Sequence, residues 1–381
     1  MKDRAAIAGI GQTGFAKRLA PTELELAASA VQMALDDAGI DPAEVDALSC
    51  YTMEQTPEFE LARTMGFGDL HFFSQVPYGG GAGCAAVGQV AMAIASGQAS
   101  VGVVWRSRKR GDARSRVWAQ VDQRMDDHWK WSRPSGLLRP VDEVAMLARR
   151  YMHEYGVGRR ELADIAVAFR AWARNNPNAC MRERPLDVDA YLNARMISDP
   201  LCLFDNCLES DGAVAVVITS TARARDLKQP PVLIHAFSQG LCRGHQSMTD
   251  YHRDQPLHTN SQATARHLWR LADFGPEAVD VAQIYDAFAP LVWFSLEAYG
   301  FCGPGEAPHW IAEHGIGPGG SAPLNTAGGS LSEAYIHGLN LVTEGVRQLR
   351  GQAASQIKGA RTCLVTGCDS TPNSALLLRR D

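Results

Sequence analysis

The sequence lacks the features that would place the protein in a membrane, outside the cell or on nucleic acid. No apolar run reaches the roughly 18 residues that a membrane-spanning helix needs. The N-terminus leads into a short strand-like segment, Ile7 to Ile10, rather than into a signal peptide. The net charge of −5 offers no basic surplus for nucleic acid or an anionic membrane surface. We therefore expect a cytoplasmic protein with no membrane span and no nucleic-acid partner.

Disulfide and metal patterns are also missing. The nine cysteines are scattered along a long chain without any Cys-x-x-Cys pair, and an odd number in this arrangement is not typical of a secreted disulfide framework. The eleven histidines show no His-Glu-x-x-His or comparable spacing. We expect reduced thiols and no metal site within this chain.

The chain does have enough apolar residues, 46% of 381, to bury a large core. Short apolar runs alternate with helical periodicities, a pattern typical of an α/β protein whose sheet is buried between helices. We expect strands at residues 7–10, 101–105, 213–218, 232–236 and 375–378, and helices at residues 23–38, 85–96, 141–155, 161–175 and 335–349.

Two segments resemble each other and indicate an internal duplication. Residues 38–51 align with residues 274–285, so that Asp46 matches Asp280 and Tyr51 matches Tyr285. We expect two related α/β halves, residues 1–230 and residues 231–381.

Residues 112–200 of the first half are rich in tryptophan and arginine and are punctuated by prolines. We interpret them as an inserted cap over the top of the half, with an arm for subunit contacts as the alternative. Trp129, Trp131 and Trp172 would suit a bulky apolar ligand, although tryptophans also pack cores.

The most informative stretch runs from Leu324 to Gly338. Gly328 and Gly329 allow positive φ and a close approach of the backbone to a ligand, and the amides that follow at a helix N-terminus can stabilise an anion. Tyr335 brings a phenol to the start of the helix expected there. The alternative is a glycine-rich connection in which Tyr335 is a packing residue.

This stretch resembles the Asn-x-x-Gly-Gly-x-x-x-x-Gly-His loop of thiolases, with Tyr335 at the place of the catalytic histidine. Together with the duplicated halves and the run from Ser210 to Ala215, it makes nearly the whole chain similar to the thiolase superfamily, in particular to its sterol-carrier-associated branch. The resemblance implies a thiolase fold, which is a duplicated five-layered αβαβα sandwich, and a homodimer.

The catalytic positions of the family differ here. The thiolase nucleophile would fall near Gly81, whereas Cys84 comes later and is expected to be a buried structural residue. The His-Asp-x-Phe element of the sterol-carrier branch reads Tyr285-Asp286-Ala287-Phe288. The cysteine is thus absent, and both polar partners are tyrosines, Tyr285 and Tyr335. Asp286 either orients Tyr285 or caps a helix.

The paired tyrosines resemble those of the thiolase-like aldolases that shorten steroid side chains as CoA thioesters. The covalent thiolase route needs a thiolate, whereas a retro-aldol reaction needs only a base for the β-hydroxyl, an oxyanion pocket and a proton donor for Cα. We expect a carbon–carbon lyase that splits a β-hydroxyacyl-CoA, such as a steroid side-chain thioester, into a ketone and a short acyl-CoA such as propionyl-CoA. Tyr335 is assigned as base and Tyr285 as acid, with the reverse order open.

Other functions remain open at this stage. The chain could be a thiolase or acyltransferase that uses Cys84 or Cys368, or a non-catalytic subunit of the same fold. The acyl group could also be a smaller branched or aromatic one.

The resemblance also implies the rest of the site and the partners. The substrate and oxyanion pocket would contain Asn325, Gly328, Gly329, Cys368 and His337. Cys368 is read as pocket wall, and His337, two residues after Tyr335 on the expected helix, should point away from the phenol. Most of the arginines between residues 106 and 116 are expected on a solvated surface or at a subunit contact, although some could meet CoA phosphates.

CoA would enter only as part of the acyl-CoA substrate, so no permanently bound cofactor is expected. Relatives in the aldolase group work with a small protein made of a zinc ribbon and an OB-fold. Because this chain lacks the cysteine pairs of such a ribbon, the partner would be a separate protein and would carry the zinc. The implied pathway is steroid degradation, a part of lipid metabolism.

Overall fold

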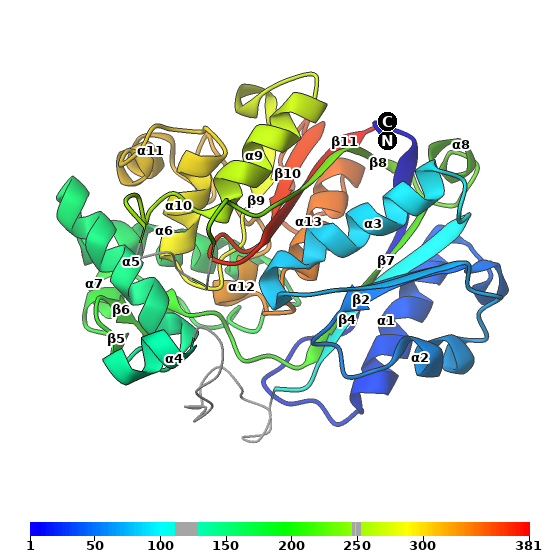
Figure 1. Cartoon of the computed structure of the whole chain (residues 1–381), viewed down its shortest axis with the longest axis horizontal. Coiled ribbons are helices and arrows are strands. Elements are labelled where there is room, and N and C mark those ends of the chain that lie inside the picture. Colours follow the sequence, from blue (N-terminus) through cyan, green and yellow to red (C-terminus); the bar gives the residue numbers. More distant parts are fainter. Residues whose placement is uncertain (111–128, 246–247, 249–252) are drawn as a thin grey trace.

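The computed structural model describes residues 1–110, 129–245, 248 and 253–381. One large mixed sheet runs through this part of the chain (Figure 1). Its first five strands, in order across the sheet, come from the N-terminal part of the chain: β3 (Phe72–Val76), β2 (Ala47–Tyr51), β4 (Val101–Arg108), β7 (Gly212–Ser220) and β1 (Ala5–Gln12). The sheet continues from β1 with β8 (Val232–Gly240), β11 (Asn373–Arg380), β10 (Thr362–Thr366) and β9 (Val281–Gln283).

The two sets of strands repeat the same pairing pattern outward from the middle of the sheet. In the first set β1 and β7 are antiparallel, β7 and β4 are antiparallel, and β4 and β2 are parallel. In the second set β8, β11, β10 and β9 follow the same sequence of directions. The aligned segments therefore supply strands in equivalent places, β2 and β9. The parallel neighbour of β2 is β3, and its counterpart beside β9 is a single parallel bridge between Ala282 and Leu324.

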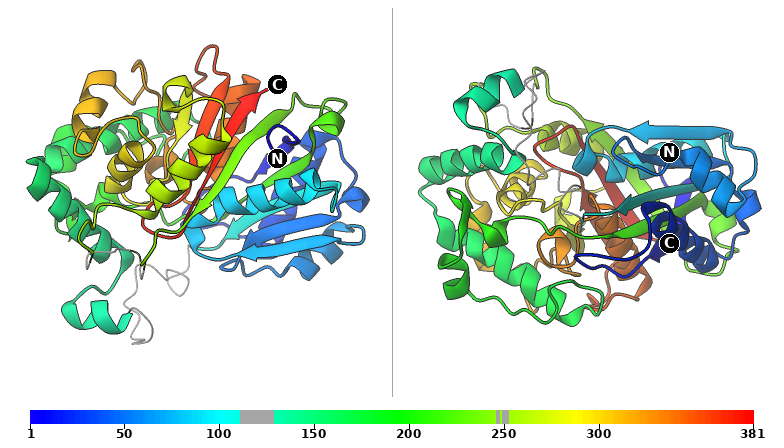
Figure 2. Two further views of the ribbon diagram at one scale, coloured as in Figure 1. Left: turned by 45° about the horizontal axis from the view of Figure 1, so that its top comes forward. Right: turned by 90° about the horizontal axis from the view of Figure 1, so that it is seen from below.

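Helices cover the outer face of each set of strands, and further helices lie between the two sets. On the outer face of the first set packs α1 (Glu23–Ala38), and on the outer face of the second set packs α9 (Asn260–Leu271). Between the sets lie α3 (Gly83–Ala95) and α13 (Leu339–Arg350), which contact strands of both (Figures 1 and 2). The order helix, sheet, helices, sheet, helix is the expected five-layered α/β arrangement.

The alternation of side chains along β1 shows why this layering forms. Ala6 and Ala8 belong to the buried cluster under α1, whereas Ala5 and Ile7 belong to the central cluster that includes α3 and α13. Successive side chains of a strand point to opposite faces. A strand that is apolar on both faces must be covered on both, which a five-layered fold achieves.

The five strand predictions are confirmed, and so are four of the five helices. The prediction for residues 23–38 coincides with α1, where Thr22 caps the N-terminus and Gly39 ends the helix at a φ of 75°. The other three are α3, α5 (Pro140–Tyr155) and α6 (Arg159–Asn175), each within two residues of the expected bounds. The prediction of a helix from residue 335 was wrong, because α13 begins only at Leu339. Positive φ values at His337 (50°) and Gly338 (82°) break the helical path before it.

The region interpreted as an insertion folds, in its described residues 129–200, mainly into helices beside the second set of strands (Figure 2). Besides α5 and α6 it contains α4 (Trp129–Ser132), α7 (Val188–Leu192) and the first strand of the small pair β5 (Met196–Ser198) and β6 (Leu201–Cys202). Trp172 is buried and donates its indole N–H to the carbonyl of Ile316 at 2.9 Å, whereas Trp131 is 76% exposed. Trp118 lies outside the described residues.

The remaining helices are α2 (Glu58–Met65), α8 (Thr221–Ala224), α10 (Pro290–Ala298), α11 (Ala307–His314) and α12 (Gly329–Ser332). In the part of the chain that the structure covers, no helix is both long and apolar enough to cross a membrane. Those same residues contain no group of three or more His, Cys, Asp or Glu side chains suited to holding a metal ion.

Candidate active site

Two tyrosines meet in the interior between the two sets of strands. Tyr285 follows β9, and Tyr335 lies in the connection between α12 and α13. Their hydroxyl oxygens are 2.8 Å apart, and their rings are 6.3 Å apart at an interplanar angle of 69°. Both are buried, at 1% and 8% exposure. The fold thus joins two phenols that are 50 residues apart in sequence.

The surroundings of the two phenols differ. Burial raises the pKa of both hydroxyls above the ordinary value of about 10. The charge of Tyr335 and the hydrogen bond to Tyr335 raise the pKa of Tyr285 further. The pKa of Tyr335 is also raised by Cys207, but it is lowered by the positive charge of Arg108 and by the hydrogen bond from Tyr285. Tyr335 is therefore the phenol that ionises more easily.

Arg108, on β4, lies over the face of the Tyr335 ring, with its guanidinium carbon 4.8 Å from the ring centroid. The side chain is 1% exposed, and its Nε and Nη1 make no hydrogen bond within the described part of the chain. Burial, together with the like charges of Arg110 and Arg106, lowers the pKa of Arg108 to about 10. This buried cation faces a phenol instead of a carboxylate.

The expectation of a solvated or subunit-contact arginine cluster was wrong for Arg106, Arg108 and Arg110, which are 2%, 1% and 7% exposed. Alternate residues of a strand share one face, so the spacing of Arg106 and Arg108 on β4 was a signal that these two side chains lie together. Arg114 and Arg116 lie outside the described residues.

A glycine turn, η2 (Gly79–Gly81), packs directly against Tyr285. A Cβ atom built on Gly80 would lie 2.0 Å from the hydroxyl oxygen of Tyr285 and 2.9 Å from Cβ of Cys368. The phenol therefore fills the space that a side chain at position 80 would need. A Cβ atom built on Gly81, near which the nucleophile was expected, would lie 1.9 Å from the carbonyl oxygen of Pro372, so the fold leaves no room for a thiol there either.

The two cysteines considered as alternative nucleophiles are both buried. The thiol of Cys84 donates to the carbonyl of Val365 at 3.5 Å, and burial raises its pKa to about 12. Cys368 donates its backbone N–H to the carbonyl of Gly80 at 3.0 Å, and burial raises the pKa of its thiol as well. A thiolate is disfavoured at both positions.

The amides after the glycine pair are already bound. The N–H groups of Ser330 and Leu331 donate to the two oxygens of Asp286 at 2.8 and 3.1 Å. The expectation that these amides face an anionic ligand is therefore not met, because Asp286 caps α12 from within the chain. Gly329, at a φ of 60°, lets this carboxylate approach, since a Cβ there would lie 2.2 Å from an Asp286 oxygen. Gly328 has a φ of 108°.

Asn325 holds the backbone just before Tyr285. Its side-chain oxygen accepts from the N–H of Ile284 and its amide nitrogen donates to the carbonyl of Ile284, both at 2.7 Å. Both polar groups of Asn325 are thus used inside the fold. Asn325 and Asp286 together fix the segment that carries Tyr285.

His337 points toward Tyr335, contrary to the sequence-based expectation. The two rings are 5.0 Å apart and nearly perpendicular, at 84°. The expectation assumed a helix, in which residues two apart diverge, whereas the backbone at His337 has a φ of 50°. The imidazole is fully buried, and its Nδ1 accepts a hydrogen bond from Nε of Arg106 at 3.1 Å.

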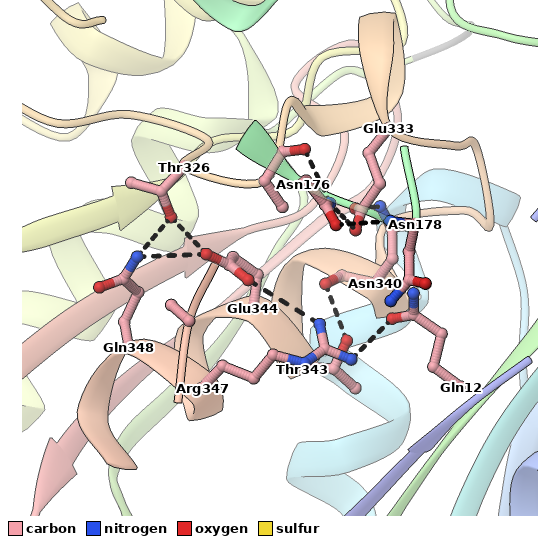
Figure 3. A network of polar contacts seen from close by, with 12 residues as sticks. Gln12, Asn176, Asn178, Thr326, Glu333, Asn340, Thr343, Glu344, Arg347 and Gln348 are labelled. Carbon is pink, nitrogen blue, oxygen red and sulfur yellow. Dashed lines mark hydrogen bonds and ion pairs between the residues drawn. The ribbon is translucent and has the colours of Figure 1, made fainter. Parts of the chain in front are cut away.

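A polar network behind the site holds the connection that carries Tyr335 (Figure 3). Glu333 accepts from Asn176 at 3.0 Å and from Asn340 at 2.9 Å, and Asn340 also donates to the carbonyl of Ala334 at 3.2 Å. Because Asn176 follows α6 and Asn340 lies on α13, the network ties Tyr335 to both elements. Burial raises the pKa of Glu333 to about 7.

Comparison with known proteins gives matches along nearly the whole chain. Residues 4–193 match the family described as thiolase, N-terminal domain, and residues 243–378 match the one described as thiolase C-terminal domain-like. A 17-hydroxy-3-oxo-4-pregnene-20-carboxyl-CoA lyase from Mycobacterium tuberculosis is 44% identical, with 99% of this chain and 100% of the lyase aligned. A steroid side-chain-cleaving aldolase from Thermomonospora curvata is 43% identical over 99% of this chain and 98% of the aldolase. The solved structure of an Ltp2-ChsH2(DUF35) aldolase superposes with a TM-score of 0.95 at 42% identity and covers 100% of this chain and 98% of its own.

Proposed function

This chain belongs to the thiolase superfamily, and we propose that it is a carbon–carbon lyase of that superfamily which cleaves a β-hydroxyacyl-CoA by a retro-aldol reaction. The observation that carries the proposal is the hydrogen-bonded pair Tyr285 and Tyr335, set against a glycine turn with no room for a nucleophile. The two curated relatives, a pregnene-carboxyl-CoA lyase and a steroid side-chain-cleaving aldolase, support a steroid side-chain thioester as substrate. The products would be a ketone and a short acyl-CoA such as propionyl-CoA.

Tyr335 acts as the base in this reaction. Its phenolate takes the proton of the β-hydroxyl, the Cα–Cβ bond breaks, and the electron pair passes into the thioester to form an enolate. Arg108 favours this phenolate because its guanidinium lies over the ring and has no carboxylate partner among the described residues.

Tyr285 acts as the acid and protonates Cα of the enolate. Tyr335 now holds the proton of the substrate hydroxyl, and Tyr285 has lost its own. The 2.8 Å hydrogen bond between the two oxygens allows that proton to pass from Tyr335 to Tyr285, which restores the starting state. The net reaction moves one proton from the β-hydroxyl to Cα and needs no added reactant.

The other predicted site residues take supporting places in this proposal. Asn325, Gly328 and Gly329 shape the backbone that positions Tyr285, and Cys368 walls the pocket beside Gly80. His337 faces the reacting phenol. CoA is part of the substrate, and no permanently bound cofactor takes part.

The test is product analysis by mass spectrometry. The chain, with and without its partner protein, is incubated with a 17-hydroxy steroid side-chain CoA thioester and no free CoA. A ketone together with propionyl-CoA is the expected result. Turnover that appears only with free CoA and a β-ketoacyl-CoA would mean that a cysteine acts and that the retro-aldol proposal is wrong.

We further propose that the chain works with a separate protein made of a zinc ribbon and an OB-fold. The solved relative supports this, since it is described as an aldolase together with a DUF35 component. Activity is expected to depend on co-expression with that partner. Full retro-aldol activity from this chain purified alone would contradict it.

We also propose a homodimer that forms at β3. Within the described residues this strand ends the sheet with one edge unpaired, and Phe73 on it is 63% exposed, as is Phe59 on α2. A second copy pairing with this edge would bury both. A Phe73→Lys variant should be monomeric by light scattering, and an unchanged mass would place the contact elsewhere.

We also propose a cytoplasmic location and a division of the chain into two halves at residue 230. A cytoplasmic location is supported by the nine cysteines, all of which are free thiols. The division into halves at residue 230 is supported by its place between α8 and β8, where the second set of strands begins.

A further inference from the structure

A buried chain of polar groups runs from Glu54 through Arg106 to His337. Arg106 donates from Nη1 to Glu54 at 2.9 Å and from Nε to Nδ1 of His337 at 3.1 Å. The side chains of Arg106 and Glu54 are 2% and 1% exposed. Ser107 holds Glu54 in turn, because its backbone N–H and its hydroxyl donate to the two carboxylate oxygens at 2.8 and 2.6 Å. The guanidinium is therefore fixed between its two partners.

This arrangement sets the tautomer of His337. A guanidinium has only donors, so Nδ1 must accept and carries no hydrogen. Burial and the positive charges of Arg108, Arg106 and Arg110 lower the pKa of His337 well below its ordinary value, which keeps the ring neutral. The single N–H of the neutral imidazole is then at Nε2.

The Nε2–H group makes no hydrogen bond with any described residue, although the side chain is fully buried. An unsatisfied buried donor is destabilising, so a donor that Arg106, Glu54 and Ser107 together hold in place indicates a partner that arrives with the ligand.

The position of His337 places this donor at the site. Its imidazole lies beside the reacting phenol, since the rings of His337 and Tyr335 are 5.0 Å apart. It also faces the glycine turn, because a Cβ built on Gly79 would be 3.6 Å from Nε2. Tyr51, the counterpart of Tyr285 in the internal alignment, donates its hydroxyl to the carbonyl of His337 at 3.5 Å and so anchors the backbone.

We propose that Nε2–H of His337 donates to the thioester oxygen of the substrate, and that Glu54 and Arg106 are positioning residues that fix this donor. This inference rests on the retro-aldol function proposed above. When the Cα–Cβ bond breaks, its electron pair moves toward that oxygen, which becomes the enolate oxygen. The pair returns when Tyr285 protonates Cα. His337 gives up no proton, and the guanidinium at Nδ1 polarises its ring, which strengthens the donor.

The first test needs no turnover. Nitrogen-15 NMR of the histidine-labelled protein reports which ring nitrogen carries hydrogen, with the His337 signals assigned by their loss in His337→Asn. The neutral Nε2–H form is expected in the wild type, and a mixture of tautomers in Arg106→Met. A wild-type imidazole with its hydrogen on Nδ1 would overturn the proposal.

The second test measures binding of two inert ligands by calorimetry: a steroid side-chain CoA thioester without the β-hydroxyl, and its thioether, which lacks the carbonyl oxygen. The wild type should bind the thioester more tightly, and His337→Phe should bind both equally. An exposed histidine on α11, His309, provides the matched control His309→Phe. A thioester preference that persists in His337→Phe would refute the proposed hydrogen bond.

The third test is kinetic. Loss of one oxyanion donor typically lowers kcat about 10² to 10³-fold, and this drop is expected in His337→Phe. If the φ of 50° prevents that variant from folding, His337→Asn replaces it, because asparagine adopts this conformation readily and is too short to reach the same place. A kcat within about twofold of wild type in the folded variant would sink the assignment. If the wild type cleaves no β-hydroxyacyl-CoA at all, the proposed function is wrong. The NMR and binding experiments still test whether Nε2–H of His337 donates to the thioester oxygen, because neither needs turnover.

Discussion

The contact between Gly80 and Tyr285 gives the sharpest prediction, for the substitution Gly80→Ala. The new Cβ would lie 2.0 Å from the hydroxyl oxygen of Tyr285 and 2.3 Å from Cζ, whereas ordinary contacts begin at 3.4 Å. Gly80 has no positive φ, so alanine meets no backbone penalty and the effect is steric. The phenol must therefore move by more than about 1 Å, the scale on which misplacement costs about 10²-fold in rate.

Stability should change far less than activity. Overpacking of one methyl group in a buried site costs about 1–3 kcal/mol, which a chain of this size tolerates. We expect Gly80→Ala to fold, with a modestly lower thermal midpoint and a kcat about 10² lower. Steady-state kinetics of the chain with its partner and thermal unfolding of the same samples measure the two effects.

Gly14→Ala is the matched control, because a Cβ built on Gly14 meets nothing within 4 Å and its φ is not positive. It should leave both quantities near wild type. Wild-type turnover in Gly80→Ala would refute the placement of the Tyr285 hydroxyl over the glycine turn. If Gly80→Ala fails to fold, the glycine turn and the Tyr285 ring cannot move apart to accommodate the methyl group.

Three further predictions follow from the buried titratable groups. Tyr335→Phe should lower the single-turnover rate about 10² to 10⁴-fold with an unchanged fold, and near-wild-type turnover would refute its role as base. Arg108→Met should shift the ascending limb of the pH profile of kcat/KM, over which the base loses its proton, to higher pH, because the charge that lowers the pKa of Tyr335 is lost. Arg108→Lys should keep most of the wild-type position, and an unmoved limb in Arg108→Met would contradict this. Burial raises the pKa values of Asp286, Glu333 and Asp369 to about 6, 7 and 6, so the folded chain keeps protons that the unfolded chain releases. The free energy of unfolding, measured in urea, should therefore fall as the pH rises from about 5 to about 8. A rise over that range would contradict the raised pKa values.

The sequence was sufficient for the fold because its signals were redundant. Apolar runs located the strands, and the helical spacing of apolar residues located α1, whose ends the structure shows at Thr22 and Gly39. The spacing of the motifs also identified the two tyrosines, which the fold brings into hydrogen-bond contact. These features depend on local sequence patterns and on the spacing between motifs, and both can be read from a single sequence.

The start of α13 could not be read in the same way. Residues 335–349 carry apolar side chains at helical spacing, but His337 and Gly338 take positive φ values that only tertiary contacts select. Arg106 donates to His337 and so holds it from the far side of the site. The error in the helix boundary and the error in the direction of His337 thus have one cause, a side-chain contact across 231 residues of sequence.

The prediction that the arginines of β4 are exposed was wrong for a related reason. Charged residues are mostly exposed, so a surface is the correct expectation until a buried partner is known. Glu54 supplies that partner for Arg106, but nothing near it in sequence marks it as buried. Arg108 has no carboxylate partner among the described residues, and its guanidinium lies over the ring of Tyr335 instead.

The absent nucleophile and the paired phenols both depend on the glycine turn, at neighbouring positions. A Cβ atom on Gly81, near the expected nucleophile position, would lie 1.9 Å from the carbonyl oxygen of Pro372. A side chain at position 80 and the hydroxyl of Tyr285 would need the same space, because their separation would be 2.0 Å. The glycine at position 80 is therefore what allows Tyr285 to reach Tyr335. A cysteine at position 80 would displace the phenol before it could act as a nucleophile, so Gly80→Cys alone gains no acyl transfer and loses the acid of the retro-aldol reaction. The retro-aldol function proposed for this chain therefore depends on the close contact between Gly80 and the phenol of Tyr285.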